Sequence, residues 1–250
     1  MTKPVNPVVI DDLHSWRGLL RCGGWSALAS VTLIIIQVGI FATWPPVHTV
    51  REVFSLMNEA PVLGLISLDA IYIVNNLLVW LVYLGLGAAL WPVSRSVVTL
   101  AVGLGTLQMA AYLGSNPAAE MLVLGREHAG ADTERARILE SAGEALLAAW
   151  KGTAFLTYYL LGAIVLLLLT WLLYHSNRFP RSATWWALAA GILMLVPSPF
   201  GTVGMVFALL SLLPWSVMCI VVGRRLLSLS STSGTRASPT HLHQNSEAGP

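Results

Sequence analysis

The sequence predicts an all-α membrane protein, a polytopic helical bundle of about six transmembrane helices. Of its 250 residues, 56% are hydrophobic and only 10% are charged, whereas about a quarter of the residues in an ordinary soluble domain are charged. Mean hydropathy is +0.71, and long apolar runs recur along most of the chain. The net charge of +2 and the lack of a dense basic cluster argue against nucleic-acid binding. The expected partner is the lipid bilayer.

Six apolar segments define the expected spans, because a spanning helix needs about 20 predominantly apolar residues. These segments are Cys22–Trp44, Val62–Trp91, Val97–Ser115, Trp150–His175, Ala183–Val196 and Thr202–Gly223. Pro197 and Pro199 separate the last two, since proline lacks an amide hydrogen and disfavours helix in the residue before it. A tight helical hairpin is predicted at these prolines.

The charges of the connecting segments predict the orientation. With a cytoplasmic N-terminus, nine Lys and Arg residues fall on the inner side and five on the outer side. The positive-inside rule then predicts that both termini are cytoplasmic. Residues 1–21 form the expected N-terminal segment, 22–227 the six-span domain, and 228–250 a disordered cytoplasmic tail rich in Ser and Thr. This threading favours a multi-pass protein of the bacterial inner (plasma) membrane.

Two outer connections have helical patterns. Residues 116–149 are predicted to be an extracytoplasmic amphipathic segment, in which Asp132 or Thr133 can cap a helix that continues to Ala149. In Val50–Met57, apolar residues at positions 50, 53, 54 and 57 predict a short amphipathic helix that lies on the outer surface.

Polar residues within the apolar spans mark the candidate site. In the stretch SLDAIYIVNN, residues 67–76, a helix turning about 100° per residue places Asp69, Tyr72 and Asn76 on one face. The predicted threading brings residues of other spans to a similar depth in the outer half of the bundle. The candidate substrate- or ion-binding residues are Asp69, Tyr72, Asn76, Gln108, Lys151 and Tyr158, with Gln37 and Tyr83 beside them.

Two interpretations of this cluster stay open. A carboxylate at the centre of a spanning helix costs roughly 2.5–3.5 kcal/mol, which favours a functional cavity in which Asp69 pairs with Lys151. Alternatively, Asp69 lies at the outer headgroups, Lys151 is an interfacial anchor, and the carboxamides join helices at about 0.6 kcal/mol each. Small residues such as Gly85 and Ala89 indicate close helix packing and no chemistry.

Catalytic and metal-binding patterns do not stand out. The chain lacks the Gly-x-Ser-x-Gly and His-Glu-x-x-His motifs and a phosphate-binding glycine loop. Cys22 and Cys219 are too few for a disulfide framework or a metal site. We therefore expect no cofactor and no metal, and enzymatic activity is the less favoured class.

The chain also resembles a known family over roughly Trp16–Leu227. The resemblance rests on Arg17 and Arg21 before the first span, LDAIYIVNN with its Asp69, WPVSRSV at Trp91–Val97, Gln108, and YHSNRFPR at Tyr174–Arg181. These features resemble bacterial six-span membrane proteins of the domain-of-unknown-function 4386 family. The resemblance implies a six-span fold and no agreed activity. The chain departs from the family by having Asn75 and Asn76 where a second acid is often found.

Three functions are compatible with these observations. The preferred one is a small transporter-like or accessory membrane protein whose outer polar cluster contacts a polar solute or lipid headgroup. The alternatives are a membrane-embedded lipid-modifying enzyme, for which Asp69, Tyr72 and Lys151 are the candidate groups, and a structural or partner-binding membrane protein. A membrane-protein partner or a homo-oligomer fits all three.

Overall fold

A computed structural model describes residues 13–47 and 49–232, and this part of the chain contains helices and no strand. The bundle is built from long helices, with shorter ones in the connections. In chain order these are α2 (Arg17–Thr43), α3 (Val50–Glu59), α4 (Pro61–Ser67), α5 (Ala70–Leu90), α6 (Arg95–Ser115), α7 (Ala118–Ala129), α8 (Thr133–Ala149), the π-helix η1 (Trp150–Ala154), α9 (Phe155–His175), α10 (Arg181–Leu193) and α11 (Gly201–Thr232).

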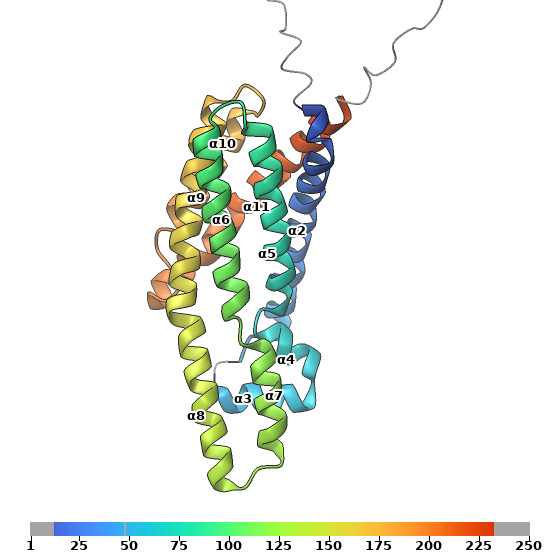
Figure 1. The fold of residues 1–250 in the computed structure, drawn as a ribbon. Helices are drawn as coiled ribbons and strands as arrows, with labels where there is room; N and C mark the ends of the chain where they lie inside the picture. Colours follow the sequence, from blue (N-terminus) through green and yellow to red (C-terminus); the bar gives the residue numbers. More distant parts are fainter. Residues whose placement is uncertain (1–12, 48, 233–250) are drawn as a thin grey trace, which may run out of the picture.

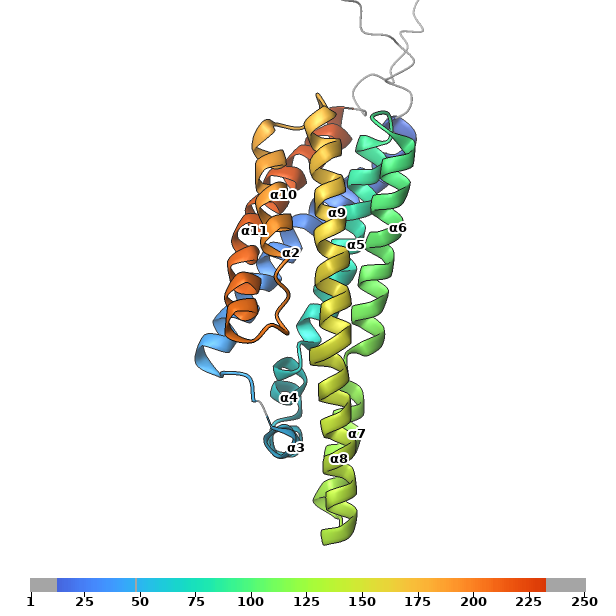
Figure 2. The same ribbon diagram turned by 90° about the vertical axis from the view of Figure 1, so that its left-hand side faces the viewer.

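The long helices run up and down roughly along one axis, whereas α3 lies across it (Figures 1 and 2). Helix α2 begins and α11 ends at the same end of the bundle, together with the α5–α6 turn and the α9–α10 connection. Helices α3, α4, α7 and α8 lie at the opposite end. The segments predicted to be cytoplasmic thus gather at one end, and the segments predicted to be extracytoplasmic gather at the other.

Within the described residues, five helices are long and apolar enough to cross a membrane. Helices α6 and α7 belong to one of them, over Arg95–Ala129, and α8 and α9 belong to another, over Thr133–His175. The expected fifth span differs, because α10 has only 13 residues where a crossing needs about 20. An irregular stretch around Pro197 and Pro199 follows α10 and leads into α11, which agrees with the predicted proline break.

Glycines bring α2 close to its two neighbours, α5 and α11. A Cβ atom placed on Gly23 would lie 3.0 Å from the Gly85 Cα atom, and one on Gly24 would lie 3.0 Å from the Gly223 carbonyl oxygen. Such contacts bring helix backbones together where lipid supplies no hydrophobic drive for association. The bundle surface exposes many large apolar side chains, including Ile35 and Leu213, as expected for a surface that contacts lipid.

The outer connections form a second small core. Its buried residues include Val50, Val53, Phe54 and Met57 of α3 together with Met121 of α7. The predicted apolar stripe of α3 is confirmed, and it is buried against α4, α7 and α8 instead of facing away from the protein.

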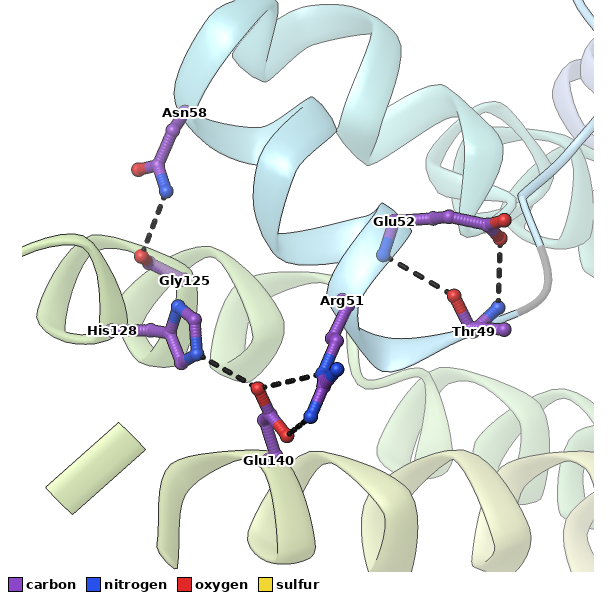
Figure 3. Close-up of polar contacts among 7 residues, drawn as sticks. All are labelled: Thr49, Arg51, Glu52, Asn58, Gly125, His128 and Glu140. Atoms are coloured by element: carbon purple, nitrogen blue, oxygen red, sulfur yellow. Dashed lines mark hydrogen bonds and ion pairs between the residues drawn. The ribbon is translucent and has the colours of Figure 1, made fainter. Parts of the chain in front are cut away.

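Polar contacts lock α3 onto the α7–α8 hairpin (Figure 3). The Arg51 guanidinium donates two hydrogen bonds, of 2.9 and 3.0 Å, to the Glu140 carboxylate, and His128 Nε2 lies 3.1 Å from the same carboxylate. Asn58 Nδ2 donates to the Gly125 carbonyl oxygen at 2.9 Å. A capping box formed by Thr49 and Glu52 begins α3, so local sequence and tertiary contacts fix the same helix.

Two predicted boundaries need correction. The second span does not run unbroken over Val62–Trp91, because Leu68 and Asp69 separate α4 from α5. The tail was expected to begin at Ser228, but α11 continues to Thr232. Residues 1–12 and 233–250, which include most of the predicted termini, lie outside the described residues.

Candidate functional site

The first feature of the site is the break between α4 and α5. Asp69 adopts a left-handed conformation with φ 59° and ψ 29°, and it is the one non-glycine residue with positive φ in the part of the chain described. Asp and Asn tolerate this conformation better than other L-residues. Asn116 Nδ2 donates to the freed Leu68 carbonyl oxygen at 2.8 Å, which satisfies the broken backbone. Asp69 therefore stands at the start of α5 and not within a continuous helix.

A second interruption lies in the fourth span. Between α8 and α9 the backbone forms the π-helix η1, and Gly152 within it has non-helical φ −91° and ψ −105°. Insertions of this kind are frequent at functional sites. The α10–α11 connection, with Ser198 and Pro199, is a third irregular segment.

These three interruptions border one cavity of about 660 Å³. Its lining includes Asp69 from the α4–α5 break, Lys151 and Gly152 from η1, and Ser198 and Pro199 from the α10–α11 connection, and side chains of α2, α6 and α11 complete it. The volume falls within the roughly 300–1,000 Å³ typical of small-molecule sites, and the lining has their usual mixture of many apolar and few polar groups.

Four of the six predicted site residues line this cavity, namely Asp69, Tyr72, Lys151 and Tyr158. Gln108 lines a smaller neighbouring cavity of about 70 Å³, which shares Tyr72 and Tyr158 with the first. Asn76 is fully buried and accepts a hydrogen bond of 3.1 Å from the Tyr158 hydroxyl. Gln108 accepts one of 3.3 Å from the Tyr83 hydroxyl. These two carboxamides thus join helices.

The expected ion pair between Asp69 and Lys151 is wrong. Among the described residues, the ion pairs join Glu140 to Arg51 and His128, and Glu127 to Arg135. The Asp69 Oδ1 atom instead accepts a hydrogen bond of 2.7 Å from Gln37 Nε2 of α2. Asp69 and Lys151 line the same cavity without touching, and Lys151 is exposed.

Buried polar atoms without partners mark the cavity wall. Five buried side-chain atoms in the described part of the chain lack a hydrogen-bond partner, and three of them are Gln37 Oε1, Tyr112 Oη and Trp150 Nε1. All three residues line the cavity, and each is at most 4% exposed. Because buried polar groups in proteins are almost always paired, these atoms are exceptions among the described residues, and the Tyr112 hydroxyl is the one that faces Asp69.

Aromatic rings supply much of the remaining wall. Tyr112, Trp150, Phe155, Tyr158 and Tyr159 all line the cavity. Their rings form a continuous chain of contacts, with centroid separations between 5.1 and 6.3 Å. Pairs at such distances stabilise one another beyond the area that they bury.

Two residues of this wall, Tyr112 and Trp150, were not among the predicted site residues. Tyr112 lies four residues after Gln108 and so shares its helix face, and the same face calculation that grouped Asp69 with Tyr72 would have found it. Trp150 was placed at a span end, where an indole commonly marks the membrane interface. Its burial beside η1 could not be predicted, because the sequence gives no clear signal for a π-helix.

Comparison with known proteins adds no relative: no family model, no curated protein and no solved structure matches the chain. The resemblance to the domain-of-unknown-function 4386 family therefore has no support from these comparisons and stays a prediction. The function must be argued from the cavity itself.

Proposed function

We propose that the protein is a multi-pass inner-membrane protein, transporter-like or an accessory subunit, whose outer-half cavity binds a small solute. The observation that carries the proposal is one cavity whose lining brings Asp69 together with Gln37, Tyr112 and Trp150, three residues that each have a buried polar atom with no partner at hydrogen-bond distance. A purely packed helix interface would leave such atoms paired or replace them with apolar groups.

The backbone irregularities support the same proposal. Non-helical backbone at membrane depth is tolerated where it is buried in protein or lines a cavity, and interrupted helices form the substrate sites of many transporters. Here the α4–α5 break and η1 border the same space. A carboxylate among apolar helices is costly and marks a functional site by default.

The cavity opens on the extracytoplasmic side in this proposal. The helix from Thr133 to His175 has 43 residues, or about 65 Å at 1.5 Å per residue, more than twice the roughly 30 Å of hydrocarbon. Helix α8, with charged residues such as Arg137 and Glu140, therefore extends beyond the bilayer. The cavity lies where α8 meets α9, near the outer boundary.

A solute panel in proteoliposomes tests the proposal. The panel contains an organic amine, a carboxylate, a sugar and phospholipid headgroup analogues, each measured for binding and for flux. The Asp69→Asn variant keeps a residue that tolerates the left-handed backbone, and Glu134→Gln, an exposed carboxylate on α8, is the matched control. We expect at least one solute to lose binding or flux in Asp69→Asn alone. Identical behaviour of both variants and the parent protein towards every solute would contradict the proposal.

The second candidate function is a structural role, which the contacts of the buried carboxamides Asn75, Asn76 and Gln108 favour. Ser30 Oγ donates to Asn75 Oδ1 at 2.7 Å, and Asn76 and Gln108 accept from tyrosines of other helices. These contacts favour packing at these positions. If a double variant, Asp69→Asn with Lys151→Met, kept full stability and function, the structural interpretation would extend to the cavity as well.

A further inference from the structure

We propose that the cavity selects an organic ammonium ion with an aromatic or aliphatic body. This inference rests on the proposed function, because it assigns the class of solute to the same cavity. It is carried by three features of the wall: a carboxylate that makes no ion pair among the described residues, a chain of aromatic rings, and a lysine that lines the same cavity without contacting the carboxylate.

The carboxylate supplies the negative charge. Asp69 Oδ1 receives the Gln37 hydrogen bond, and none of the ion pairs in the part of the chain described includes Asp69. Gln37 is itself only 2% exposed, so its carboxamide holds the carboxylate in place and leaves it without a countercharge. A ligand ammonium would supply that charge and donate the hydrogen bonds that a carboxylate accepts.

The aromatic wall suits the body and the charge of such a ligand. The Tyr112 and Tyr158 centroids are 5.1 Å apart, and those of Trp150 and Phe155 are also 5.1 Å apart. The faces of such rings attract ammonium groups that lie within about 6 Å of the ring centroid. The Gln37 and Tyr112 side chains lie beside Asp69, and their oxygens can accept hydrogen bonds from a primary ammonium once a side-chain shift exposes them.

The position of Lys151 bears on which charge the ligand carries. Its ammonium lines the same cavity but is exposed and makes no ion pair within residues 13–47 and 49–232. An anionic ligand would be attracted by Lys151 and repelled by Asp69, which has the more buried position. A neutral polyol would require many more polar partners than this wall has. A cationic ligand therefore fits best, with Lys151 as a weak competitor for Asp69.

Calorimetry on the full chain in lipid nanodiscs tests the class of ligand. The probes share one ring and differ in charge: 2-phenylethylammonium, phenyltrimethylammonium, 2-phenylethanol and 3-phenylpropionate. We expect the two ammonium probes to bind more tightly than the neutral and anionic ones. Asp69→Asn should weaken ammonium binding by about tenfold or more, as expected for loss of a charged hydrogen-bond partner. Phe155→Leu should weaken it by about two- to fivefold.

Two variants guard against misfolding as the explanation. Lys151→Met should bind the ammonium probes more tightly than the parent, because it removes a competitor for Asp69, and Glu134→Gln should bind them unchanged. The inference would be overturned if the anionic or neutral probe bound as tightly as the ammonium probes. It would also be overturned if Asp69→Asn bound the ammonium probes as tightly as the parent protein. If only a solute of another class binds in the proteoliposome panel, the ligand class is wrong and the proposed function survives. If no solute binds in either experiment, both fail.

Discussion

The contact between Gly23 and Gly85 allows the packing of α2 against α5 to be tested quantitatively. This packing also holds Gln37 of α2 against Asp69 at the start of α5. A Cβ atom on Gly85 would lie 3.0 Å from the Gly23 Cα atom and 3.2 Å from the Leu19 carbonyl oxygen. Both neighbours are backbone atoms, so a Gly85→Ala substitution must push two helices apart.

The expected magnitude follows from two opposing terms. Overpacking of a tight contact costs about 1–3 kcal/mol, while replacing glycine by alanine inside a helix gains about 1 kcal/mol. Gly103 provides the matched control, because nothing lies within 4 Å of a Cβ atom placed there. We therefore expect Gly85→Ala to be less stable than Gly103→Ala by about 1–3 kcal/mol.

Reversible unfolding in bicelles with increasing sodium dodecyl sulfate measures both free energies of unfolding. In the same samples, loss of ligand binding in Gly85→Ala would show that the α2–α5 contact also supports the cavity. Equal stability of the two alanine variants would refute the close approach of α2 and α5.

Three further predictions concern single side chains. Tyr158→Phe should lower the free energy of unfolding by about 0.6 kcal/mol, the usual contribution of a hydrogen bond between membrane helices, and an unchanged free energy of unfolding in bicelles would contradict a packing role for Asn76. Asp69→Ala should be about 1–2 kcal/mol less stable than Asp69→Asn, because alanine strains the left-handed backbone; equal unfolding midpoints would count against that conformation. The pKa of Glu140 lies below its ordinary value, mainly because Arg51 donates hydrogen bonds to the carboxylate and to a smaller extent because His128 contacts it. The Arg51–Glu140 contact should therefore stabilise α3 at neutral pH and be lost as acid protonates Glu140. Amide exchange in α3 should then speed up, relative to a Glu140→Gln variant, as the pH falls below the ordinary glutamate pKa of about 4.3. The same pH dependence of exchange in both proteins would rule this out.

The long helices could be predicted from the sequence because their signal is local. Runs of about 20 apolar residues predict spans by length alone, and Thr49 and Asp132 begin their helices as their side chains favour. Prolines 197 and 199 likewise mark the break before α11. Ala183–Val196 was predicted to be a span because it is almost wholly apolar, although its 14 residues fall short of the roughly 20 that a crossing needs, and α10 is correspondingly short.

The candidate site was predictable in its location but not in its contacts. Helix periodicity and threading brought Asp69, Tyr72, Lys151 and Tyr158 to a similar depth, and all four line the same cavity. The pairing of Asp69 with Lys151 followed from similar depth and opposite charge and was wrong, because Asp69 instead accepts a hydrogen bond from Gln37 on α2. The break at Asp69 has no strong local signal, since Leu68 and Ala70 on either side suit a continuous helix.

Access of water to the cavity from the extracytoplasmic side is the most direct test of the account. Tyr72 lines the cavity, while Val74, on the same helix, is 53% exposed on the bundle surface. After replacement of Cys22 and Cys219, the variants Tyr72→Cys and Val74→Cys are treated in intact cells with a membrane-impermeant, charged thiosulfonate. The account predicts rapid modification of the Tyr72→Cys thiol and none of the Val74→Cys thiol, because thiols in lipid do not ionise. Equal reactivity of the two thiols, or reaction of the Tyr72→Cys thiol only after the inner face is exposed, would contradict an outward-facing cavity.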